Sequence, residues 1–137
     1  MSRKIEDHLI DGFRYKKYPF KPVPKPRMTR SDKWNKRDCV LRYREFKDEV
    51  KRYGIRLPAD FFHVIFVLPI PKTTSKKKVS EMAYTKHLKK PDKDNLEKAL
   101  LDAVYDNDSH VWDSRVTKIW GGEKEESYIL IGVKDDK

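Results

Sequence analysis

The sequence predicts a single α+β domain in which a small mixed β-sheet carries helices on one face. Two segments repeat apolar residues at helical spacing, and three others are short, apolar and rich in the β-branched and aromatic residues of strands. The 137 residues amount to one domain. We therefore expect one compact domain over residues 1–137, and the pattern leaves the order of the strands open.

A basic, proline-rich segment over about residues 14–37 comes first. Four prolines between residues 19 and 26 alternate with lysines, which excludes a helix and favours extended backbone, including an edge strand of a sheet. A disordered basic arm is the alternative. Cations and one aromatic residue follow the prolines, a combination suited to phosphates and unstacked bases: Arg27, Arg30, Lys33, Trp34 and Lys36.

Positive charge is concentrated in one part of the chain. The net charge is +10, and residues 14–44 hold twelve Lys/Arg against two acids, so this stretch carries the whole excess. A localised excess of this kind is typical of a surface that binds a polyanion such as DNA. A solvated basic face is the alternative interpretation.

The first predicted helix is followed by a buried strand. The helix has an apolar stripe and is expected to end at Gly54; its stripe is Val40, Tyr43, Phe46, Val50 and Tyr53. The run Phe61–Leu68 is short, β-branched and aromatic, so we expect a buried strand. His63 within it is interpreted as a histidine tolerated in a strand, not as a ligand.

A short helix and a second long helix are expected next. Ser75 is a candidate N-cap for a helix that runs to Met82 and begins with Lys76, Lys77 and Lys78. A basic loop, His87–Lys90, contains Lys89 and Lys90. The second long helix begins near Asp92–Asp94 and has a stripe of Leu96, Ala99, Leu100, Ala103 and Val104.

Two strands close the predicted fold. Val111–Trp120 and Ser127–Val133 have strand composition and are separated by a loop with Gly121-Gly122. We expect these two strands to pair as a hairpin.

Two tight groups of acidic residues stand out in a chain that otherwise favours an anionic partner. Asp92 and Asp94 precede Lys98, and Asp106 and Asp108 follow the helix. Carboxylates grouped in this way suit Mg²⁺, which prefers hard oxygen ligands and can activate water for attack on a phosphate. Lys98 lies one turn after Asp94 on the same helix face, where it can stabilise charge on the phosphate.

An ordinary structural interpretation of these acids remains open. A D-x-D at a helix start can be an N-cap with a dipole-compensating acid, and Asp106-Asn107-Asp108 can be a plain turn. Asp94 and Lys98 can likewise be a surface ion pair.

No segment has the ~20 apolar residues of a membrane helix, so we expect no membrane partner. The single cysteine, Cys39, has no partner for an internal disulfide or a cysteine metal site. These features favour a cytoplasmic protein.

At the acidic block the sequence resembles the RusA family of Holliday-junction resolvases. The family's Lys-Pro-Asp-x-Asp-Asn-Leu-x-Lys block is similar to KPDKDNLEKALLDAV here, and its Asp-Asp-Ser turn is similar to YDNDSHV. Weaker likenesses are PVPKPRMTR, FVLPIPKTTSKKK and the strand ending at Lys118-Ile119-Trp120-Gly121. The departure is in the turn, where the family's adjacent aspartates read Asp-Asn-Asp.

The resemblance implies a function and a set of site residues. It assigns the metal-binding aspartates to Asp92, Asp94 and Asp108, with Asp106 as the alternative third ligand, and the catalytic lysine to Lys98. Asp102 also matches a family position and is expected to be a structural partner. The resemblance further implies a homodimer that binds four-way DNA junctions and nicks them symmetrically with Mg²⁺, or Mn²⁺, leaving 5′-phosphate ends in DNA recombination and repair.

Candidate DNA contacts follow from where cations cluster. They are Arg27, Arg30, Lys33, Lys76, Lys77, Lys78, Lys89 and Lys90. Two rival functions account for the charge without the acids: a branched-DNA-binding protein without catalysis, and an RNA-binding protein. Neither rival calls for the set of three aspartates.

Overall fold

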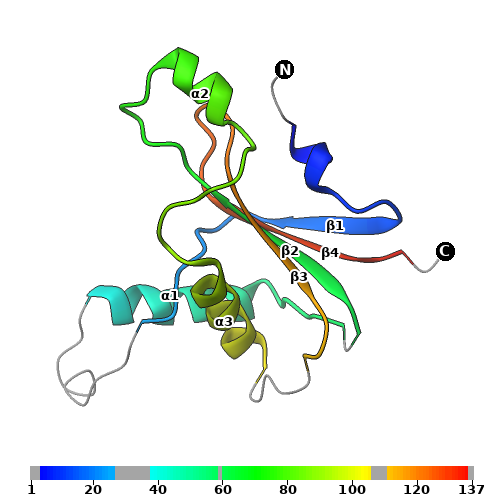
Figure 1. Cartoon of the computed structure of the whole chain (residues 1–137). Coiled ribbons are helices and arrows are strands. Elements are labelled where there is room, and N and C mark those ends of the chain that lie inside the picture. The colour runs from blue at the N-terminus through cyan, green and yellow to red at the C-terminus, as the bar shows by residue number, and fades with distance from the viewer. Residues whose placement is uncertain (1–3, 27–37, 59, 106–110, 136–137) are drawn as a thin grey trace.

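The computed structural model describes residues 4–26, 38–58, 60–105 and 111–135 and has a four-stranded mixed sheet at its centre (Figure 1). The strands lie in the order β1-β4-β2-β3. Their bounds are β1 (Phe13–Tyr18), β4 (Tyr128–Lys134), β2 (Phe62–Leu68) and β3 (Arg115–Trp120). The predicted α+β fold class, one small mixed sheet with helices, is confirmed.

Strand β2 occupies the interior of the sheet because it is apolar on both faces. All seven of its residues are buried, as expected for the FFHVIFVL run. It pairs with β4 in antiparallel and with β3 in parallel orientation. A strand that is buried on both faces and hydrogen-bonded on both edges displaces other pairings.

The predicted hairpin between the last two strands is therefore wrong. Strands β3 and β4 follow each other in sequence, but β2 lies between them. Their local composition and the Gly121-Gly122 loop were compatible with a hairpin. The pairing is set by β2, an earlier strand whose seven residues are all buried and which pairs with β3 on one edge and β4 on the other.

Two helices cover one face of the sheet, at the lower part of Figure 1. Helix α1 (Asp38–Arg52) buries Val40, Tyr43, Phe46 and Val50, and helix α3 (Lys93–Val104) buries the predicted stripe from Leu96 to Ala103. Gly54 follows α1 with a φ of 61°, the left-handed conformation that ends a helix at glycine. Both long helices are confirmed close to their predicted ends.

The opposite face of the sheet is covered by the N-terminal segment. A 3-10 helix, η1 (Ile5–His8), and Leu9 pack with Tyr15 and Tyr84 over a second apolar cluster built on Ile65 and Val67. Strand β1 is an edge strand paired with β4, and the four prolines follow it between residues 19 and 26. The expected extended edge strand thus precedes the prolines.

The short helix α2 (Lys76–Met82) stands away from the sheet, at the top of Figure 1. Ser75 is its N-cap, as predicted, and its side chain accepts a hydrogen bond from the Lys78 backbone N–H. None of its residues is buried. No helix in the described part of the chain is long and apolar enough to cross a membrane.

Candidate active site

The first turn of α3 presents two aspartates to solvent. Asp92 occupies the N-cap position and Asp94 lies in the first turn, and both side chains are exposed. The Asp92 side chain makes no capping hydrogen bond. Capping is the ordinary reason for an aspartate at this position. Its absence leaves both lone-pair-bearing oxygens of Asp92 available to a ligand.

Lys98 lies one turn after Asp94 on the same side of the helix. It is exposed, and no ion pair joins it to Asp94 among the ion pairs of the described residues. The alternative interpretation of Asp94 and Lys98 as a surface ion pair is therefore wrong for this structure. An ammonium and two carboxylates lie at the start of one helix without neutralising one another.

A second lysine lies beside these acids. Lys118 is aligned with Phe66 across the parallel pairing of β2 and β3, so its side chain is on the sheet face that α3 covers. Its Nζ donates hydrogen bonds to the backbone carbonyls of Lys89, at 2.5 Å, and Pro91, at 2.7 Å. Burial lowers the pKa of Lys118, and the negative charge of Asp92 opposes that shift. Lys118 thus ties the loop that precedes Asp92 to the sheet.

The segment just before Lys89 and Pro91 is also hydrogen-bonded to β3. Tyr84 and Thr85 exchange backbone hydrogen bonds with Trp120, and the His87 N–H donates to the Lys118 carbonyl at 3.1 Å. His87, at the start of the basic loop, is buried, with its ring centroid 4.1 Å from that of Trp120. Burial lowers the pKa of His87. The approach to Asp92 is therefore anchored along its length.

Asp102, on the same helix as Asp94, has a partner. Its Oδ2 lies 2.5 Å from the Nζ of Lys25, and the Lys25 N–H also donates to the Asn95 carbonyl. This contact ties the proline-rich segment to α3. It agrees with the expectation that Asp102 is structural.

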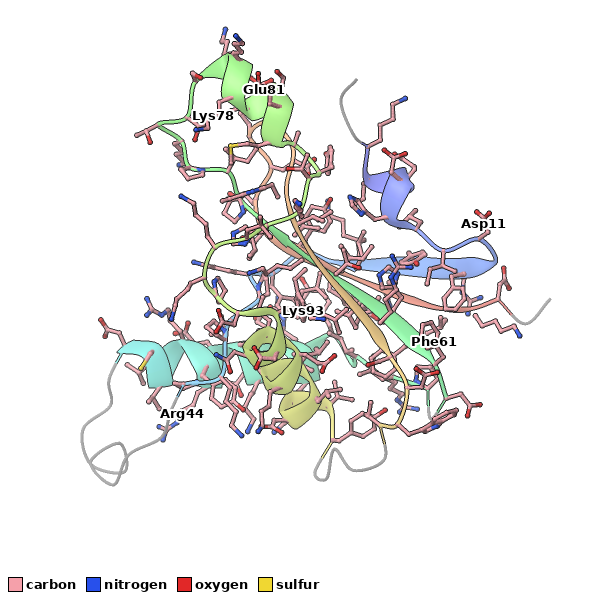
Figure 2. The ribbon with its side chains drawn as sticks, viewed as in Figure 1. Asp11, Arg44, Phe61, Lys78, Glu81 and Lys93 are labelled. Atoms are coloured by element: carbon pink, nitrogen blue, oxygen red, sulfur yellow. The ribbon has the colours of Figure 1, made fainter. Side chains whose placement is uncertain are left out.

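The predicted DNA-contacting lysines divide into two groups. Lys89 and Lys90 are exposed in the loop next to Asp92. Lys76, Lys77 and Lys78 are exposed on α2. Figure 2 shows α2 at the top of the view and Lys93, at the start of α3, near its centre. Arg27, Arg30, Lys33, Asp106 and Asp108 lie outside the described residues.

The donors in the described part of the site suit a hard divalent cation but are incomplete as a set. Among residues 4–26, 38–58, 60–105 and 111–135, no three acids, histidines or cysteines gather as a metal-binding group. Asp92 and Asp94 are exposed and form no ion pair within these ranges, and such carboxylates are the kind of ligands that Mg²⁺ takes together with water and phosphate. The expected third ligand, Asp108, is outside the described residues.

Another hollow among the described residues lies away from the candidate active site. It encloses about 980 Å³ between the ends of β1 and β2, α2 and the segment from Glu123 to Ser127. Apolar residues such as Phe20 and Ile70 share its lining with lysines and glutamates. No residue proposed for catalysis lines it, so it does not belong to the candidate active site.

The structure is that of a small basic α+β domain in which exposed acids and a lysine lie together on the first turns of one helix. A family model described as "Endodeoxyribonuclease RusA" matches residues 19–131. The chain therefore belongs to the RusA family of endodeoxyribonucleases, which are Holliday-junction resolvases. No curated protein matches the chain.

Membership confirms the resemblance of the acidic block, and the structure adds Lys118. Sequence reasoning had noted Lys118 only as part of a strand ending, without a role. The available signal was its position: a lysine two residues before Trp120 in an otherwise apolar strand end. A charged residue at that position needs polar partners, which a sequence alone does not identify.

Proposed function

We propose that this chain is a Mg²⁺-dependent, structure-selective endonuclease that resolves four-way DNA junctions by paired symmetric nicks in DNA recombination and repair. The observation that carries the proposal is the start of α3: Asp92 makes no capping hydrogen bond there, and neither Asp92 nor Asp94 forms an ion pair with another described residue. Lys98 and the anchored Lys118 lie beside these two acids. Carboxylates kept exposed and unneutralised would repel DNA unless a cation joined them.

The metal ligands are assigned as Asp92, Asp94 and Asp108, with Mn²⁺ as an alternative to Mg²⁺. Asp108 enters from its place in the family motif and Asp92 and Asp94 also from their exposure at the helix start. When bound, the ion polarises a phosphoryl oxygen and lowers the pKa of a bound water. The proposed products are 5′-phosphate and 3′-hydroxyl ends.

The two lysines have different roles in this proposal. Lys98 is exposed and has no ion-pair partner among the described residues, so its ammonium can approach the phosphate and stabilise the negative charge that develops during attack. The Nζ of Lys118 already donates to two carbonyls, so it acts through the loop. It holds the backbone before Asp92, in the way that hydrogen bonds around a metal site hold the ligands of the metal in place.

Junction binding is assigned to the clustered cations, and paired cutting to a homodimer. Lys89 and Lys90 lie beside the acids, where they can bind the phosphates that flank the cut. Two symmetric nicks need two active sites, and a twofold-symmetric dimer supplies them most simply. Contacts with phosphates position the protein without reading base sequence.

The deciding experiment uses a synthetic mobile four-way junction with the wild-type chain and the Asp94→Asn variant, in Mg²⁺ and in EDTA. We expect paired nicks that need the metal and are lost in the variant, which should still bind the junction because a repulsive charge is removed. The isosteric amide is the control for shape. Binding without nicks in Mg²⁺ and in Mn²⁺ would show a DNA-binding protein without catalysis instead.

A further inference from the structure

Trp112 lies near the candidate active site with most of its side chain in solvent. It is 72% exposed, although large aromatic residues are mostly buried in folded chains. The preceding residue, Val111, packs against the main core, so the backbone that carries the indole is anchored. A large ring held outward from anchored backbone is suited to contact a partner, because it loses little conformational freedom on binding.

The indole forms part of an open hollow of about 420 Å³ that adjoins α3. The hollow is lined by Glu97 and Leu101 of α3 and by Val111, Trp112, Asp113 and Ser114. Glu97 comes three residues after Asp94, so the two side chains are neighbours on the helix surface. The hollow therefore borders the side of α3 that carries Asp94.

The charge of this lining restricts what can occupy the hollow. Its ionisable residues, Glu97 and Asp113, are both acidic. A phosphate would be repelled there, although the chain as a whole carries a net charge of +10 and attracts DNA. A nucleobase has no formal charge and offers a flat π-face, which is the surface that tryptophan stacks on.

We propose that Trp112 stacks on an unstacked base of branched DNA, at a nucleotide close to the cleaved phosphate. The proposal rests on the proposed nuclease function and adds a base-binding subsite to it. A base at a branch point leaves its stack at lower cost than a base inside a duplex. Stacking on Trp112 therefore favours branched over linear DNA without requiring a particular base.

The test is a thermodynamic cycle between Trp112 and the DNA, measured as junction affinity in EDTA so that no cutting occurs. Trp112→Ala should weaken junction binding about five- to 100-fold, Trp112→Phe should retain most of the affinity, and binding to linear duplex should change little. Junctions with one abasic nucleotide, placed in turn within about three nucleotides of the nick, then locate the contact. At one position the Trp112→Ala effect should vanish, because the stacking partner is already missing.

Leu41→Ala is the matched control, because Leu41 is an exposed apolar residue on α1, away from the hollow. Its effect should be small and additive with every abasic position. The proposal is overturned if the effect of Trp112→Ala adds to that of the abasic nucleotide at every position. It is also overturned if sedimentation shows that Trp112→Ala changes the number of subunits, because Trp112 would then contact another copy of the chain. If the wild-type chain nicks junctions but Trp112→Ala shows no coupling to any abasic position, only this proposal is contradicted. If the wild-type chain neither binds nor nicks junctions, the proposed function is contradicted as well.

Discussion

Two polar clusters on opposite faces of the same sheet differ in how completely their groups are satisfied. Under η1, His63 is fully buried, and its ring nitrogens lie 2.7 Å from the Tyr15 hydroxyl and 2.8 Å from the Thr117 hydroxyl. The Tyr15 hydroxyl also accepts a hydrogen bond from the Ile10 N–H. At the start of α3, by contrast, Asp92 and Asp94 are exposed, and Asp92 makes no capping bond.

The difference separates polar groups that are satisfied within the chain from the acids that we propose to act in the site. A buried polar group is stable only when it is hydrogen-bonded, so the His63 cluster is complete within the chain and needs no ligand. Within the described residues, Asp92 makes no capping hydrogen bond and neither Asp92 nor Asp94 has an ion pair, which leaves their oxygens available to a cation. Asp102 supports this comparison, because it lies on the same helix and already has Lys25 as its partner.

The largest effect on activity is expected from Lys98. Lys98→Ala should slow single-turnover cleavage of a junction by about 100- to 1000-fold, the cost of removing one group that stabilises charge in a transition state. Junction affinity and the melting temperature should change little, because Lys98 is exposed and forms no ion pair with any residue that the structure describes. A variant that cuts at the wild-type rate would remove Lys98 from the active site.

The buried cluster should control stability instead, through pH. Burial lowers the pKa of His63 from 6.5 to about 4. The unfolded chain therefore binds a proton between these values that the folded chain does not, so stability falls as the pH drops from about 6.5 to 4. The loss should reach about 3 kcal/mol. Urea unfolding at several pH values measures this loss of unfolding free energy. In the His63→Gln variant, the part of the pH dependence that comes from His63 should be absent.

Lys118 should affect the active site without contacting the DNA. Lys118→Met removes the hydrogen bonds to the carbonyls of Lys89 and Pro91, so the loop no longer holds Asp92 in place. We expect about a 10- to 100-fold loss of activity or apparent metal affinity. A raised Mg²⁺ concentration should restore part of the lost activity of Lys118→Met. The Lys118→Arg variant should keep more of the wild-type activity than Lys118→Met does.

Lys134→Met, at the end of β4, is the matched control because it removes a strand lysine far from α3. Its cleavage rate should match the wild type at every Mg²⁺ concentration. If both variants lost the same cleavage activity, the effect would come from the lower net positive charge of the protein and not from the loop before Asp92.

The smallest effect is expected from Asp102→Asn. Its partner Lys25 is about one-third exposed, so the ion pair is partly screened by water. The free energy of unfolding should fall by about 0.5–1 kcal/mol, and cleavage should stay within about threefold of the wild type. A loss of cleavage as large as that of Lys98→Ala would show that having a partner does not mark an acid as structural.

The helices, the buried strand and the acid-and-lysine block could all be read from local patterns. The stripe from Val40 to Val50, the FFHVIFVL run and the Asp92–Lys98 spacing are each complete within a few residues, so local sequence suffices. The predicted hairpin failed because strand pairing depends on burial across the whole sheet. The role of Lys118 was missed because its partners are 27 and 29 residues away.

The sequence by itself determined the elements, the family motif and the residues of the acidic block, because periodicity and short motifs are properties of neighbouring residues. Only the tertiary structure decided that β2 separates β3 from β4 and that Lys118 anchors the loop before Asp92. It also decided that the Asp92 side chain makes no capping hydrogen bond, whereas Asp102 forms an ion pair with Lys25. The physical reason is that pairing, burial and hydrogen-bond satisfaction depend on groups that are distant in the chain and adjacent only after folding.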